Sequence, residues 1–154
     1  MPIAIAPAAQ AGIYCDPGWT YAVTSNTTNT MHVVDRTSVT NSTGSTKVNA
    51  TFKADQAGTF SATASISLTA EASAAVSAKV SATVNSAITH SMTTTIGTST
   101  TADVKPYSTL KADYGIVREN VSMKKYYMYS NCQTSSPTYF TYAAPYRKNW
   151  KLYY

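Results

Sequence analysis

Residues 59–88 alternate between polar and apolar side chains, and this pattern restricts the fold of the chain more than any other feature. Fourteen of the fifteen even-numbered residues from Phe60 to Ile88 are apolar, whereas their odd-numbered neighbours are mostly serine and threonine. A β-strand places successive side chains on opposite faces, and a helix does not produce such alternation. The pattern therefore predicts an extended ribbon with one apolar face and one hydroxyl face.

The alternating run is too long to be a single strand. At about 3.3 Å per residue it would extend for roughly 95 Å, so it must reverse direction. A three-residue loop preserves the phase of the alternation, and we expect this loop at residues 71–73. The arms are then residues 60–70 and 74–84, and each has the length of the roughly 9–11 residues with which a tilted strand crosses a bilayer. The main apolar positions of this expected membrane hairpin are Phe60, Ile66, Leu68, Val76, Val80 and Val84.

A short helix within residues 71–88 is the alternative for the second arm. Val76, Val80 and Val84 are spaced by four residues in an alanine-rich stretch, which also fits the apolar stripe of a helix. We favour the hairpin, because the alternation with serine continues and valine is a better strand former than helix former.

The rest of the chain has the composition of short strands. Residues 19–39 contain two β-type runs separated by the polar "NTTNT", which predicts two strands and a turn. "YGIVREN" and "KKYYMYSNC" predict two further strands around a turn at Asn120. The sequence predicts seven to nine strands and little or no helix. We expect one all-β domain over residues 12–154, built as an elongated antiparallel sheet or sandwich.

The beginning of the chain and its two cysteines indicate secretion. Residues 1–11, "MPIAIAPAAQA", have the small-x-small ending of a signal peptide. Cys15 and Cys132 are then best interpreted as one disulfide, the usual state of paired cysteines outside the cytosol. Closing so long a loop is worth about 4 to 5 kcal/mol in the chain-entropy model. We expect a secreted, extracellular protein.

The sequence contains no catalytic motif. His32, His90 and the seven acidic residues are scattered, and no metal-ligand spacing, nucleophile motif or phosphate-binding glycine loop links them. We therefore expect neither an enzyme nor a cofactor nor a metal site.

Positive charge and aromatic residues are concentrated near the end of the sequence. The chain is neutral through Glu119, and the last 35 residues supply the whole net charge of +5 and ten of the seventeen aromatic residues. Tyr, Trp, Lys and Arg together suit lipid headgroups, cell-surface glycans or a protein partner. No nucleic-acid motif is present, so we expect no nucleic-acid partner. The expected binding residues are Lys124, Lys125, Tyr126, Tyr127, Tyr146, Arg147, Lys148, Trp150 and Lys151.

The Ser/Thr-rich run over residues 51–104 resembles the stalk and insertion region of aerolysin-type β-pore-forming proteins. This resemblance implies an aerolysin-like fold, a homo-oligomeric ring and a membrane pore lined by the hydroxyls of the two arms. The whole chain also looks like small secreted actinobacterial β-proteins with a comparable "YG" strand and "YYMYSNC" ending, some of which are adaptors in toxin particles. The function expected first is therefore pore formation. The alternative is an adaptor or structural subunit, because the alanine-rich apolar face also suits contact with another protein.

Overall fold

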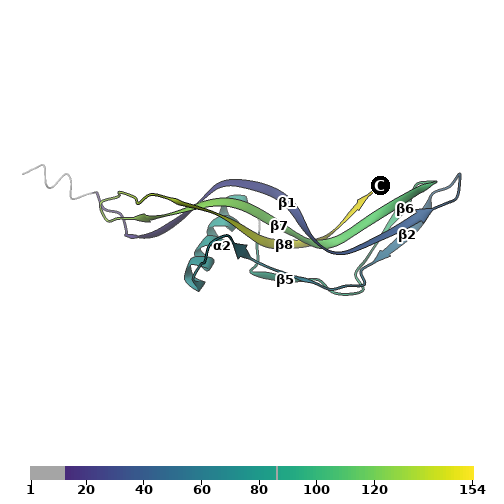
Figure 1. Ribbon diagram of the computed structural model, residues 1–154, viewed down its shortest axis with the longest axis horizontal. Helices are drawn as coiled ribbons and strands as arrows, with labels where there is room; N and C mark the ends of the chain where they lie inside the picture. The colour runs from purple at the N-terminus through teal and green to yellow at the C-terminus, as the bar shows by residue number, and fades with distance from the viewer. Residues whose placement is uncertain (1–12, 86) are drawn as a thin grey trace, which may run out of the picture.

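The computed structural model describes residues 13–85 and 87–154, so the expected end of a signal peptide lies outside the described residues. Three long antiparallel strands form a twisted ribbon that runs the length of the molecule (Figure 1). The strands of this central ribbon are β1 (Gly18–Asn41), β7 (Ser108–Met128) and β8 (Thr138–Tyr153), with β4 (Thr63–Ala64) on the outer edge of β8. The expected elongated, antiparallel all-β fold is confirmed.

The two turns expected within the central ribbon are wrong, because β1 and β7 continue through both positions. Their register shifts between Thr27 and Thr30, where β1 contains one extra residue. The side chains of Arg118 and Asn120 both donate hydrogen bonds to Thr30 Oγ1, the former from Nε at 3.1 Å. Polar residues that signal a turn in the sequence thus stabilise an irregularity of the kind called a β-bulge.

Residues 42–107 leave the central ribbon after β1 and return to it at β7; we call this segment the excursion. Its elements are β2 (Val48–Lys53), β3 (Thr59–Ser61), β4, α2 (Ala70–Val84), β5 (Ser91–Thr93) and β6 (Ser99–Val104). β2 pairs with β6 and β3 pairs with β5, so the two limbs of the excursion run antiparallel beside the ribbon and carry α2 between them (Figure 1).

The central ribbon has two hydrophobic clusters on its opposite faces. Val121 and Met123 of β7 belong to the cluster beneath α2, while Leu110 and Ala112 belong to the cluster beneath β2 and β6. These pairs of residues have opposite parity on one continuous strand, and alternate side chains of a strand point to opposite faces. The excursion therefore covers one face near one end of the ribbon and the other face near the other end.

The hairpin arm expected over residues 74–84 is wrong for this structure, because α2 occupies residues 70–84. Thr69 caps the helix by accepting a hydrogen bond from Ala72 N at 3.1 Å, and Asn85 ends it in the left-handed conformation. Alanine is the best helix former, and Val76 and Val80 bury one stripe. The short helix considered as the alternative is the conformation observed.

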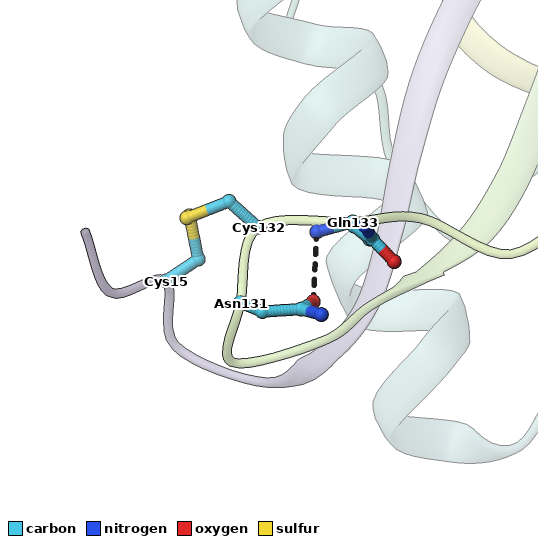
Figure 2. The surroundings of a disulfide bond; sticks show 4 residues. All are labelled: Cys15, Asn131, Cys132 and Gln133. Atoms are coloured by element: carbon cyan, nitrogen blue, oxygen red, sulfur yellow. Dashed lines mark hydrogen bonds between the residues drawn. A yellow bond between two sulfur atoms is a disulfide. The ribbon is translucent and has the colours of Figure 1, made fainter. Parts of the chain in front are cut away.

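The disulfide between Cys15 and Cys132 is present, as expected (Figure 2). It joins the segment before β1 to the loop between β7 and β8, and Cys15 N also donates a hydrogen bond to Ser130 O at 3.0 Å. Within the loop, the side-chain oxygen of Asn131 accepts a hydrogen bond from Gln133 N at 3.1 Å (Figure 2). The bridge therefore closes one end of the central ribbon, which we call the disulfide end.

Candidate functional site

The titratable side chains do not converge on one site. The described part of the chain contains no group of three His, Cys, Asp or Glu residues placed to hold a metal ion. His32 stacks on Phe60 with ring centroids 5.3 Å apart, and the Arg118 guanidinium lies 5.1 Å from the centroid of the same ring. Asp35 accepts a hydrogen bond from Asp55 N at 2.7 Å. These residues fasten the excursion to the ribbon, and two other features remain as candidate sites.

The first candidate is the paired part of the excursion, in which residues 48–62 run antiparallel to residues 90–104; we call it the stem. Its two short sheets share one register, because the numbers of directly opposed residues add up to 152 in both. Opposed residues include Val48 and Val104 in one sheet and Phe60 and Met92 in the other.

Backbone hydrogen bonds carry this register between and beyond the two sheets. They run from Ala54 N to Thr98 O (2.9 Å), from Thr94 N to Gly58 O (2.8 Å) and from Ala62 N to His90 O (2.7 Å). The intervening residues 55–57 and 95–97 are equal in number, so neither limb gains a residue on the other. The stem is therefore one two-stranded ribbon with a local interruption.

The two faces of the stem differ in chemistry. Even-numbered residues supply the buried face of the stem, where Phe52, Ala54 and Val104 are buried. Val48, Gln56, His90 and Ile96 are the exposed even-numbered residues. Odd-numbered residues face outward and form cross-strand contacts, such as the hydroxyls of Thr59 and Thr93 at 2.8 Å. Within the run predicted to alternate, the two faces are therefore present over residues 59–64, where the even-numbered residues are partly buried and the odd-numbered ones exposed.

Helix α2 is attached to the central ribbon by few large side chains. Val76 and Val80 are its fully buried residues, and Val84 is partly buried beside them. Burial raises the pKa of Tyr142 on the ribbon, while a hydrogen bond with the side chain of Ser77 acts in the opposite direction. A groove of about 460 Å³ lies along the first turns of the helix. Its lining residues are Leu68, Thr69, Ala70, Ser73, Ala74, Ser77 and His90.

The second candidate is a set of aromatic and lysine side chains at the disulfide end. Trp19 of β1 lies edge-on to Tyr127 of β7 at 5.4 Å, and Tyr127 contacts Tyr129 at 5.1 Å. Lys125 Nζ lies 5.1 Å from the centroid of Trp19. The exposed fractions are 58% for Trp19, 48% for Tyr129 and 67% for Tyr139, which are high for such large apolar side chains. We call this surface the aromatic end; it consists of Trp19, Lys124, Lys125, Tyr126, Tyr127, Tyr129 and Tyr139.

The structure divides the expected binding residues between two places. Lys124, Lys125, Tyr126 and Tyr127 lie at the aromatic end, where Lys124 Nζ is 5.8 Å from the centroid of Tyr126. The other five lie farther along β8: Tyr146, Arg147, Lys148, Trp150 and Lys151. Trp150 stacks on Tyr114 at 4.7 Å and borders the second hydrophobic cluster, so its ring has a packing role.

Sequence reasoning missed Trp19 as part of a surface, because more than 100 residues separate it from Lys125 along the chain. The signal that could have placed it is the cysteine pair. A bridge from Cys15 to Cys132 brings the start of β1 next to the end of β7, and Trp19 is directly opposed to Tyr127 in that pairing.

No helix among the described residues is long and apolar enough to cross a membrane. Comparisons of the chain with protein-family models, with curated proteins and with solved structures find no match.

Proposed function

We propose that this protein is a membrane-active, pore-forming protein whose excursion converts into a membrane-inserting β-hairpin. The observation that carries the proposal is the single register of the stem. On its even-numbered face Val48 opposes Val104, Ala50 opposes Ala102 and Phe60 opposes Met92, while Phe52 opposes Thr100. A hairpin that extends this register needs no slip in either limb. The stem is therefore a template on which the segment now in α2 can pair.

Continued through α2, the register gives a new position for the turn. Leu68 would oppose Val84, and Ala70 would oppose Ala82, all on the apolar face. The turn would fall at residues 75–77, four residues beyond the position expected from the sequence. The arms would then be residues 60–74 and 78–92, each longer than the roughly 9–11 residues needed to cross a bilayer.

The charges of α2 are compatible with this hairpin. Glu71 and Lys79 are both odd-numbered, so both would lie on the hydroxyl face, diagonally across the strand pair. In a ring of such hairpins this face lines the water-filled lumen, while the even-numbered face meets lipid. The alanines of the lipid face contribute little hydrophobic surface each, and the proposal therefore includes a homo-oligomer in which many hairpins add their contributions.

Disulfide trapping tests the register directly. Ala70 and Ala82 are exposed on the helix and lie about 18 Å apart along its axis, too far for a disulfide. In the proposed hairpin they are directly opposed. We expect the double variant Ala70→Cys/Ala82→Cys to form a disulfide only after the protein meets lipid vesicles.

The matched control is Ala70→Cys/Ala78→Cys, which also joins two exposed alanines of α2 but is out of register by four residues. Equal trapping of both pairs on vesicles, or trapping of Ala70 with Ala82 before vesicles are added, would contradict the proposed hairpin.

Release of a dye from vesicles tests the pore itself. We expect leakage from the unmodified protein, no leakage from Ala72→Asp, which places a charge on the lipid face, and retained leakage from Ser73→Asp on the hydroxyl face. Circular dichroism checks that both variants are folded. A protein that neither leaks vesicles nor oligomerises, but binds one defined partner protein, would favour the adaptor function instead.

A further inference from the structure

We propose that the aromatic end is a docking surface for an anionic lipid bilayer and that the hairpin enters the membrane from this end. The inference rests on the proposed function for the hairpin, but it is carried by a different set of residues. It assigns to the elongated molecule a membrane-facing end and a distal end.

The direction of the excursion supports this assignment. β4 runs antiparallel to β8, with Thr63 opposite Ala143, and Ser65 N donates to Thr141 O at 3.0 Å. Each further residue of this arm therefore lies closer to Thr138, where β8 begins and where Lys125 of β7 is its partner. The arm of an extended hairpin points toward the aromatic end.

The length of the arm agrees with this placement. At the observed register Leu68 would lie opposite Thr138, so residues 69–76 would project beyond the central ribbon. Six strand residues and the first part of the turn span at most roughly 26 Å, somewhat less than the roughly 30 Å of a bilayer's hydrocarbon core. With the aromatic end at the level of the headgroups, the tip of the hairpin approaches the far side of the membrane.

The composition of the aromatic end matches the headgroup region of a bilayer. Exposed Trp and Tyr side chains are characteristic of that region, where an apolar ring and a polar atom both find partners. The ammonium groups of Lys124 and Lys125 lie near aromatic rings. The ion pair found among the described residues joins Arg36 to Asp113, elsewhere on the ribbon. Residues 13–27 and 120–141 contain two lysines and one acidic residue, Asp16. This excess of positive charge suits anionic lipid.

The same side chains fit a stacked sugar less well. The planes of Trp19 and Tyr127 are 87° apart, so the two rings do not form one flat platform for a glycan chain. The ammonium of Lys125 also covers the ring of Trp19. The geometry therefore favours a lipid surface over a neutral glycan.

The two tryptophans of the chain make this proposal testable, because they mark different regions of the ribbon. In Trp150→Phe the fluorescence reports Trp19 at the aromatic end, and in Trp19→Phe it reports Trp150. The probes are phosphatidylcholine vesicles with brominated acyl chains, with and without phosphatidylglycerol. We expect the bromines to quench Trp19 when phosphatidylglycerol is present, and to leave Trp150 unquenched. Stronger quenching of Trp150, or equal quenching by neutral vesicles, would overturn the proposal.

A charge variant measures the contribution of the lysines. Lys124→Gln/Lys125→Gln should lower partitioning onto anionic vesicles about 30-fold, the effect of two juxtamembrane lysines. The control is Lys47→Gln/Lys105→Gln, which removes two exposed lysines near the opposite end of the ribbon, one of them also beside a tyrosine ring. An equal effect of both variants would show that binding depends on net charge and not on the position of the lysines, and would overturn the assignment of the aromatic end. Retention on a sulfated polysaccharide with no binding to vesicles would assign the surface to glycans instead.

Binding and leakage are measured in the same samples, so the two proposals can fail separately. Vesicle binding through Trp19 without leakage would reject the pore and leave the docking surface intact. Leakage that is equal for neutral and anionic vesicles, and that persists in Lys124→Gln/Lys125→Gln, would reject the docking surface and leave the pore intact.

Discussion

The central ribbon and the excursion follow the same alternating pattern, but they bury side chains of different size. The ribbon buries large residues such as Ile116, Met123 and Phe140, and its strands pair over most of the length of the molecule. Apart from Phe52 and Thr94, the buried residues of the excursion are alanine and valine, and its paired segments are three and six residues long. Alternation thus determines which face a residue joins, whereas side-chain size determines how firmly an extended segment is held.

This difference explains why a helix forms within an alternating sequence. Alanine has the most favourable helix propensity of all residues, and it buries little apolar surface in a sheet. Neither conformation therefore has a large free-energy advantage in residues 70–84. The cap at Thr69 and the burial of Val76 and Val80 are sufficient to favour the helix. In the central ribbon, a buried phenylalanine or methionine contributes roughly 1.5–3 kcal/mol by its burial, and no helix competes.

The largest contrast between the two regions is expected at their glycines. A Cβ at Gly115 would collide with the backbone carbonyl of His32 in the centre of the ribbon, so Gly115→Ala should destabilise the fold by about 3 kcal/mol. Gly97 in the excursion has a φ of +94° but open space around it, so Gly97→Ala should cost only about 1–2 kcal/mol of backbone strain. Urea unfolding of both variants gives the two values. A larger loss at Gly97 would reverse the contrast.

A smaller effect is expected from loosening α2. Val80→Ala removes a fully buried side chain and should lower the free energy of opening of the helix by about 2 kcal/mol. Hydrogen exchange should then accelerate for the amides of α2 and stay unchanged for those of β7, because the two regions open separately. Ala78→Ser on the exposed side of the same helix is the control. Acceleration in β7 as well would mean that ribbon and helix unfold as one unit.

The smallest effect concerns the pH dependence of the contact between α2 and the ribbon. Burial raises the pKa of Tyr142 above its ordinary value of 10.0, so the folded protein keeps this proton at a pH where the unfolded chain loses it. Stability from this group is fully present below pH 10 and falls as the pH rises toward the folded pKa. The free energy of unfolding of Tyr142→Phe should fall less steeply over this alkaline range. Identical slopes for the two proteins would remove Tyr142 as a cause.

The sequence was sufficient to predict the features that depend on local pattern or on chemistry. The parity of residues 59–64 follows from the alternation, as the partly buried Phe60 and the exposed Thr59 illustrate. The pairing of Cys15 with Cys132 follows from there being only two cysteines in a chain with the features of a secreted protein.

Features that depend on distant partners could not be predicted. Asn120 has the composition of a turn, and only the presence of Thr30 across the strand pair makes it a strand residue. The conformation of residues 74–84 depends on a small balance between helix and strand, which alternation alone does not resolve. Trp19 escaped prediction as part of the aromatic end because it meets Tyr127 only through the pairing of β1 with β7.

The stem also has a consequence for errors of pairing. Between Ala62 and Ala82 the chain repeats small apolar and hydroxyl residues so regularly that a shift by two positions would oppose nearly equivalent side chains. A segment of this kind, alone in solution, has no means of choosing one partner alignment and is prone to join other copies of itself. Phe52, Val104 and the contact between Asn49 and Asp103 distinguish one alignment from all others. The stem therefore fixes the pairing register of a segment whose own sequence does not specify one.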